Sequence, residues 1–297
     1  MARRDWLFLV ILSILWGGSF LFVEVALRGL PPLTIVAARV GLAALILGAV
    51  MRARRVPFPP RNVWPALAVM GLLNNAVPYT LFVVAQGQIS GALASILNAT
   101  TPLFTVIVAH VATTDERITP AKALGLLLGF SGVVVMMAGV SFGGAVAAKV
   151  MCLGAAVSYA LAGVWGRRFR RLGLPPLTTA FGQVAASSVM LTPLGLLVDR
   201  PWTLPWPGAD AIGAVVAIAA LSTALAYLIY FRVLASSGAT NLSVVTFLIP
   251  VSAVSMGVVL LGEEVLPQHV AGFALIAAGL LAIDGRFGLL RARGSNT

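Results

Sequence analysis

Long apolar runs separated by short polar connections dominate the sequence. Most of them approach the roughly 20 residues that an α-helix needs to cross a bilayer. The ten runs are residues 6–23, 33–50, 63–84, 91–112, 121–140, 146–165, 177–198, 211–231, 239–261 and 270–283. The tenth is short, and its counting as a span relies on the flanking His269 and Asp284 reaching toward the interfaces. The pattern predicts an all-α integral membrane protein with about ten transmembrane helices and no separate soluble domain.

Composition supports the membrane assignment. Hydrophobic residues make up 60% of the chain and charged residues only 10%, whereas a soluble domain has about 25% charged residues. The formal net charge of +11 comes from basic residues scattered over short connections. That distribution is typical of topology signals beside anionic lipid and not of a nucleic-acid site. We therefore expect the lipid bilayer, and no nucleic acid, as a partner.

The positions of the basic residues predict the orientation, because connections rich in Lys and Arg stay in the cytoplasm. With ten spans, sixteen of the 20 basic residues fall on the side of both termini. Arg28, Lys149 and Arg200 fall on the other side, and Arg39 lies inside the second run. Both termini are therefore expected in the cytoplasm.

Two internal repeats divide the chain. The pentapeptide Leu-Pro-Pro-Leu-Thr occurs at residues 30–34 and again at 174–178. A second pattern, E-x3-P-x4-G-x6-G, also occurs twice, at Glu116, Pro120, Gly125 and Gly132 and at Glu263, Pro267, Gly272 and Gly279. The spacing predicts two units, residues 1–145 and 146–297, of five helices each. An odd number of crossings inverts the second unit, and inverted repeats are typical of carriers.

At this point the sequence resembles a known family. The segment Trp-Gly-Gly-Ser-Phe at residues 16–20, Arg39 in the second run and the duplicated Glu-Pro-Gly-Gly endings look like the drug/metabolite transporter superfamily, and specifically its ten-helix EamA-type exporters. The resemblance implies a central cavity walled mainly by helices 1, 3, 4, 6, 8 and 9. It also implies export of amino acids or similar metabolites across the bacterial inner membrane.

Polar and aromatic residues away from the helix ends are the candidates for a cavity lining, because polar groups inside hydrocarbon need partners or water. The candidates are Trp16, Asn74, Asn75, Tyr79, Ser95, Asn98, Tyr159, Trp165, Thr223, Tyr227 and Thr246. Together they would form an aromatic, weakly polar pocket that suits an amphipathic zwitterion. The alternative is structural: such side chains also hydrogen-bond helices together, and Trp165 has the position of an interfacial anchor.

Prolines and glycines inside the runs have mainly structural interpretations. Pro102 and Pro250 occupy equivalent places in the two units and are expected to bend their helices, either as simple kinks or as bending points during access exchange. Gly125, Gly129 and Gly132 on helix 5, and Gly272 and Gly279 on helix 10, are expected to allow close helix packing.

Arg39 is the one basic residue well inside a span. A central Arg costs roughly 2.5 to 3.5 kcal/mol on insertion scales. Because Arg39 lies near one end of its helix, we expect it to snorkel outward to the interface. A role as a carboxylate clamp is the alternative, and Glu24 is a possible ion-pair partner.

The sequence favours a carrier for neutral or zwitterionic solutes that works by alternating access. No Asp, Glu or His lies near the middle of a run, so transport is expected to follow the solute gradient or to couple through groups at the cavity mouths. Mid-depth basic clusters for phosphorylated substrates are also missing. The alternatives are an exporter of drugs or other metabolites with the same fold, or, in a different class, a membrane channel or scaffold.

An enzyme is not expected. The sequence shows no paired nucleophile and base, no pair of carboxylates and no H-E-x-x-H zinc motif. His110 and His269 lie near helix ends without ligand-spaced neighbours, and Cys152 is the single cysteine. We therefore expect no metal and no cofactor. No pattern in the sequence indicates an oligomeric state.

Overall fold

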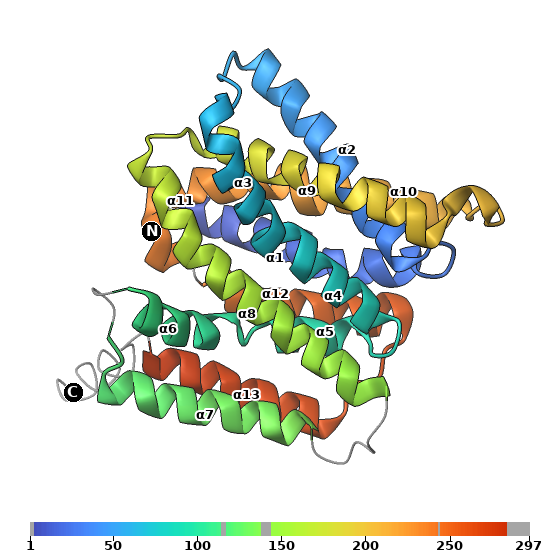
Figure 1. Ribbon diagram of the computed structural model, residues 1–297. Helices are drawn as coiled ribbons and strands as arrows, with labels where there is room; N and C mark the ends of the chain where they lie inside the picture. The colour runs from blue at the N-terminus through green and yellow to red at the C-terminus, as the bar shows by residue number, and fades with distance from the viewer. Residues whose placement is uncertain (1–2, 114–116, 138–143, 243, 284–297) are drawn as a thin grey trace.

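The computed structural model describes residues 3–113, 117–137, 144–242 and 244–283, and every regular element in these ranges is helical (Figure 1). Within them, seven segments are long and apolar enough to cross a membrane. Three shorter apolar helices, Pro120–Val135, Val245–Leu261 and Pro267–Ile283, bring the total to the ten that the sequence predicts. The protein is thus an all-α, multi-pass membrane protein.

Six of the ten spans are single helices. They are α1 (Arg3–Ala26), α2 (Pro32–Ala53), α7 (Pro120–Met137), α8 (Gly144–Arg171), α9 (Pro176–Asp199) and α13 (Pro267–Ile283). The other four are assembled from shorter pieces. The third span consists of η1 (Arg61–Val63), α3 (Trp64–Gly71), η2 (Leu72–Ala76) and α4 (Val77–Gln86), and the fourth consists of α5 (Gly91–Asn98) and α6 (Thr101–Ala112). The eighth consists of α10 (Ala209–Ala217), η4 (Ile218–Leu225) and α11 (Ala226–Leu242), and the ninth consists of α12 (Val245–Met256) and η5 (Gly257–Leu261). A further turn, η3 (Pro201–Thr203), follows α9.

Several helix boundaries differ from the prediction. The sixth span continues to Arg171, six residues beyond the expected end. The ninth begins at Val245 and not at residue 239, because the eighth extends over these residues. Gly238 interrupts the end of α11 with a φ of 76°, a conformation that glycine adopts without steric cost. The helical extension of the sixth span is basic and that of the eighth is partly polar, so hydropathy alone could not mark these helix ends.

Two π-helical turns occupy equivalent places in the third and eighth spans. The first, η2, carries Asn74 and Asn75, and the second, η4, carries Thr223. The hydroxyl of Thr223 donates to the carbonyl of Ile218, five residues earlier, at 3.0 Å. Such turns widen the helix locally and occur frequently at functional sites. Both units therefore have an irregular, polar turn in the third helix of their repeat.

The two Leu-Pro-Pro-Leu-Thr segments begin α2 and α9, which pack against each other. Thr34, at the start of α2, donates from its amide and its hydroxyl to the carboxylate of Asp199 at the end of α9 (2.6 and 2.9 Å). Thr178, at the start of α9, donates to the carbonyl of Pro57, just beyond α2 (2.9 Å). The two helices therefore run in opposite directions, and the two copies of the pentapeptide lie at opposite ends of the bundle.

The glycine-rich faces of α7 and α13 lie against each other along one edge of the bundle (Figure 1). A Cβ atom added to Gly125 would stand 2.5 Å from the carbonyl oxygen of Gly279, and one added to Gly132 would stand 2.5 Å from that of Gly272. Side chains there would force the two backbones apart. The expectation that these glycines allow close packing is confirmed.

Candidate functional site

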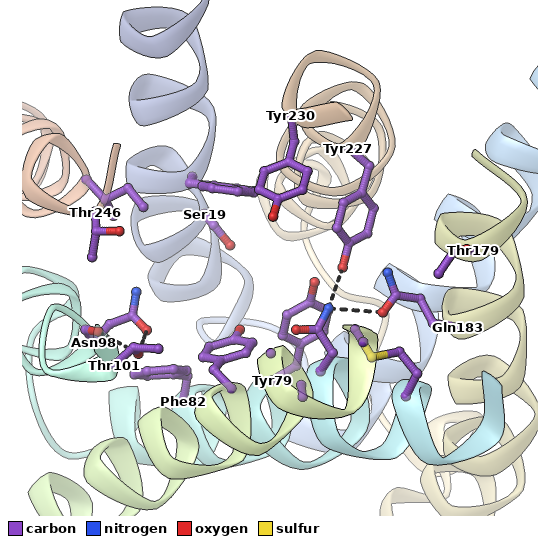
Figure 2. A pocket seen from close by; sticks show the side chains of 18 of the residues that line it. Ser19, Tyr79, Phe82, Asn98, Thr101, Thr179, Gln183, Tyr227, Tyr230 and Thr246 are labelled. Carbon is purple, nitrogen blue, oxygen red and sulfur yellow. Dashed lines mark hydrogen bonds between the residues drawn. The ribbon is translucent and has the colours of Figure 1, made fainter. Parts of the chain in front are cut away.

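A cavity of about 630 Å³ lies between the helices of the two units (Figure 2). This volume falls within the range of roughly 300 to 1,000 Å³ that is usual for small-molecule sites. Its walls include residues of the first, third, fourth, sixth, eighth and ninth spans, as the resemblance implies. They also include residues of the second span, α2, and of the seventh span, α9. The last two contribute Arg39, Thr179 and Gln183, which sequence reasoning did not place in the lining.

Seven of the predicted cavity residues line this space. They are Trp16, Asn74, Tyr79, Asn98, Tyr159, Tyr227 and Thr246. They come from six different spans, so the fold brings together residues that are far apart in the sequence.

The other four predicted residues lie outside the lining. Ser95 is fully buried and donates to the carbonyl of Ala92. Asn75 is also fully buried, since it follows Asn74 directly and its side chain leaves the helix on a different face. Thr223 is buried as well. The indole of Trp165 donates to the carbonyl of Ala66 at 3.0 Å. Trp165 thus ties α8 to α3 and does not face the cavity.

Arg39 does not snorkel outward. Only 6% of its surface is exposed, and its side chain lines the cavity. Its Nε donates to the hydroxyl of Thr223 at 3.0 Å, and its guanidinium carbon lies 3.6 Å from the ring centroid of Tyr79. Within the described part of the chain it has no ion pair with a carboxylate. The suggested partner, Glu24, instead accepts a hydrogen bond from the amide of Gly91. The hydroxyl and the aromatic face hold the cation inward.

An amide network lies beside Arg39. The Nδ2 of Asn74 donates to the Oε1 of Gln183 at 3.0 Å and to the hydroxyl of Tyr227 at 3.1 Å (Figure 2). Gln183 follows Leu174 by nine residues, and Arg39 follows Leu30 by nine residues. The repeated pentapeptide therefore contained the signal that Arg39 and Gln183 occupy equivalent positions in the two units.

A second polar group lies at the break between α5 and α6. Asn98 is the last residue of α5, and the hydroxyl of Thr101 donates to its carbonyl at 2.8 Å (Figure 2). Pro102 stands in the first turn of α6, directly after the break, and Pro250 is buried inside α12. Interrupted helices with free backbone groups are typical of transporter binding sites.

Aromatic rings form much of the remaining wall. Trp16 contacts Tyr230 with ring centroids 5.7 Å apart, and Phe82 contacts both Phe20 (5.6 Å) and Tyr159 (6.3 Å). The sequence offered a signal for two of the rings that were missed. Phe82 follows Tyr79 by three residues and Tyr230 follows Tyr227 by three, so each pair shares one helix face.

The lining extends along the axis of the bundle. At one end it reaches Leu174 and Pro176, beside the strongly basic end of α8; we call this the basic end. At the other it reaches Val23 and Gln86. Beyond these two residues the amides at the start of α5 are held by carboxylates from two other segments, so we call this the closed end.

These carboxylates belong to Glu24 on α1 and Glu263 in the connection before α13. Glu24 accepts from the amide of Gly91 at 3.1 Å, and Glu263 accepts from the amide of Ala92 at 2.9 Å. Because Gly91 and Ala92 are consecutive residues, the two carboxyl groups lie beside each other. Burial, together with the neighbouring carboxyl group of Glu24, raises the pKa of Glu263 to about 7. No pair of carboxylates was evident in the sequence, because no local spacing indicates this one, which forms only through folding.

Among the residues that the structure describes, the histidines have no such acidic partners. His269 is buried on α13, and the Nδ1 of His110 accepts from the amide of Ile118 at 3.3 Å. Within the described ranges no three His, Cys, Asp or Glu side chains come together in a way that could hold a metal ion.

A helical membrane protein with antiparallel equivalent helices and a central, largely apolar cavity that carries a few polar groups has the architecture of a transporter. A profile of the EamA-like transporter family matches residues 5–138 and again residues 147–283. The chain therefore belongs to the EamA-like transporter family, whose members contain two repeats of five helices.

Its relatives carry transporter names. The chain is 28% identical to the uncharacterized transporter YvbV of Bacillus subtilis, over 95% of this chain and 92% of that protein. It is 26% identical to the uncharacterized inner membrane transporter YedA of Escherichia coli K12, over 85% of this chain and 81% of that protein. A solved crystal structure shares the fold, with a TM-score of 0.67, 22% identity and coverage of 95% of this chain and 98% of its own.

Proposed function

We propose that this transporter exports small carboxylate-bearing metabolites, amino acids or similar zwitterions, across the bacterial inner membrane by alternating access. Arg39 carries the proposal. A buried cation without an acidic partner in the described chain is costly in a membrane, and a substrate carboxylate would offset that cost with a charge-assisted hydrogen bond.

The rest of the lining suits the remainder of such a substrate. The rings of Trp16, Phe82 and Tyr230 offer apolar contact, and an ammonium group would also be attracted by their faces. Asn74 and Gln183 supply neutral hydrogen-bonding groups near Arg39. Purely cationic drugs would be repelled by Arg39, so a zwitterion fits the lining better than a cationic drug does.

Direction follows from the two ends of the cavity. The proposed topology places both termini and the basic end in the cytoplasm, where Lys- and Arg-rich connections are retained. A cavity that reaches the basic end would then load substrate from the cytoplasm and release it after the closed end opens. A cavity tied shut at one end favours a carrier over an open channel.

The test begins with metabolite profiling of the medium from overproducing cells. The purified protein is then placed in liposomes, and counterflow is measured with labelled phenylalanine as a first zwitterion and with the solutes found by profiling. We expect saturable counterflow, competed by phenylalanine more strongly than by phenylalanine amide or phenethylamine, which lack the carboxylate. Flux that rises linearly with concentration would indicate a channel, and stronger competition by the amine would contradict the carboxylate anchor.

A further inference from the structure

Two acidic side chains from different repeats meet at the closed end of the cavity. Glu24 comes from the first helix of the chain, and Glu263 comes from the connection between the ninth and tenth spans. Each holds one amide of the first turn of α5, at Gly91 and Ala92. The pair therefore links three segments that would have to separate for this end to open.

The backbone is shaped to receive one of these carboxyl groups. A Cβ atom added to Gly257, in the π-helical turn η5, would lie 2.7 Å from the carboxyl carbon of Glu263. A side chain at this position would therefore displace the carboxyl group. The hydroxyl of Ser90 also lies near Glu263. Glu263 thus sits in a slot formed by a glycine, an amide and a hydroxyl.

A separate observation points to a proton-carrying ligand beside this slot. Gln86 lines the cavity and is 7% exposed, and its Nε2 donates to the carbonyl of Phe20 at 3.1 Å. That carbonyl and the Glu24 carboxylate both lie beside Gly91, so Gln86 lies close to the carboxyl pair. The Oε1 of Gln86 is buried and accepts no hydrogen bond from the described residues. A buried acceptor without a donor is suited to water or another proton donor that enters from the cavity.

Two carboxyl groups held on consecutive amides lie close enough to share one proton, because two ionised carboxylates would repel each other. Consistent with this, the pKa of Glu263 is raised to about 7 by burial and by Glu24. At this end of the adjoining segments, the other charged or titratable groups are Arg28 just beyond α1, Glu264 in the same connection, His269 near the start of α13 and Lys149 near the start of α8. Arg28 and Glu264 are exposed, whereas His269 and Lys149 are buried.

We propose that Glu24 and Glu263 form a proton-binding site which keeps this end of the cavity closed while they share a proton and lets it open when both are ionised. The closed state then binds one proton more than the open state, in which the exposed carboxyl would regain a pKa near 4.5. Closure is therefore fully favoured below about pH 4.5 and is lost as the pH rises toward 7. By linkage the ratio of closed to open states changes by at most roughly tenfold per pH unit in this window. A role in coupling export to proton entry rests on the proposed carrier function, but the proton site itself does not.

The test uses no substrate, so the proton-site proposal can be judged even if the carrier proposal fails. Spin labels are attached to cysteines placed at the exposed residues Gln88 and Leu266, on either side of the contact, in a Cys152→Ser background. We expect the distance between the labels to be short at pH 5.5 and longer at pH 8.5. Glu263→Gln and Glu24→Gln should keep it short at both pH values, because an uncharged amide mimics the protonated carboxyl. The matched control Glu264→Gln, at an exposed carboxylate in the same connection, should behave as the wild type.

A second measurement does not depend on how the variants fold. The infrared band of a protonated carboxyl group should be present in the wild-type protein at pH 5.5 and should disappear by pH 8.5. The same loss is expected in Glu264→Gln. A label distance that is the same at both pH values, or a Glu263→Gln protein that opens with pH as the wild type does, would overturn the proposal. Absence of the carboxyl band at pH 5.5 would also overturn it.

Discussion

The second helices of the two repeats, α2 and α9, occupy equivalent positions but carry different chemistry. Arg39 on α2 reaches Thr223 in the π-helical turn of the second repeat. Gln183 on α9 bonds to Asn74 in the π-helical turn of the first repeat. Each helix therefore contacts the irregular turn of the opposite repeat, but only one of them brings a charge.

This difference separates the scaffold from the binding chemistry. Paired pentapeptides, paired π-helical turns and paired tyrosines preserve the inverted symmetry, and such symmetry lets one architecture open to either side. A single cation at one of two equivalent positions breaks that symmetry inside the cavity. It gives the site a direction, because a carboxylate would bind toward α2 and not toward α9.

The largest effect on substrate binding is expected from Arg39→Gln, which gives α2 the same residue that α9 has at the equivalent position. Loss of a charge-assisted hydrogen bond to the substrate costs about 1.5 to 3 kcal/mol, which corresponds to a roughly ten- to hundredfold rise in Kd or KM. Counterflow in liposomes measures the change. Arg39→Lys keeps the charge but loses the planar guanidinium, so its KM should fall between that of the wild type and that of Arg39→Gln. An unchanged KM for a carboxylate-bearing substrate in Arg39→Gln would remove the anchor from the cavity.

Moving the charge to the other helix sharpens the comparison. In the double variant Arg39→Gln with Gln183→Arg, the cation stands on α9, where the hydroxyl of Tyr227 and the amide of Asn74 lie nearby. We expect recovery of carboxylate binding to within roughly tenfold of the wild type, since the desolvated charge is restored. Thermal-shift assays with the substrate and with its amide would measure this recovery of carboxylate binding. Binding no better than in the single Arg39→Gln variant would mean that charge alone is not sufficient and that position matters.

The residues next to these helices should respond in opposite directions. Thr223→Val leaves the Nε of Arg39 without its acceptor, so the melting temperature in detergent should fall by an amount equivalent to about 1 kcal/mol. Asn75, the equivalent of Thr223 in the first repeat, is fully buried and its amide has no partner among the described residues. Asn75→Leu should therefore be neutral or stabilise the protein, by up to about 1 kcal/mol. Destabilisation by both substitutions to the same extent would contradict the asymmetry.

The sequence predicted the spans and their close packing well, because the bilayer itself dictates these features. Long apolar runs are needed to cross hydrocarbon, and Gly125 and Gly279 face each other because two backbones meet there. The boundaries of the two expected halves, 1–145 and 146–297, remain a prediction. The placement of both termini in the cytoplasm also remains a prediction.

The cavity lining was predicted less well, for identifiable reasons. Asn74 and Asn75 are adjacent, and in a helix whose neighbours are all apolar the sequence does not reveal which of them faces inward. The π-helical turn at this point also changes the helical spacing on which such reasoning relies. Arg39 was expected outside because hydropathy rates charge as unfavourable, whereas the Thr223 hydroxyl and the Tyr79 ring accommodate it within the protein. Glu24 and Glu263 meet only through folding, and no local spacing indicates that contact.

The smallest effect on substrate binding among the cavity variants is expected at the neutral member of the pair, with Gln183→Ala. Gln183 is 2% exposed and accepts one hydrogen bond from Asn74, which retains a second partner in Tyr227. The loss should therefore cost about 0.5 to 1.5 kcal/mol of stability and raise the KM for a carboxylate-bearing substrate by only a few fold. Counterflow and melting temperature should be measured together with those of Arg39→Gln. If Gln183→Ala weakened binding as much as Arg39→Gln does, the two equivalent positions would share the recognition of substrate, and the cation would not set its direction.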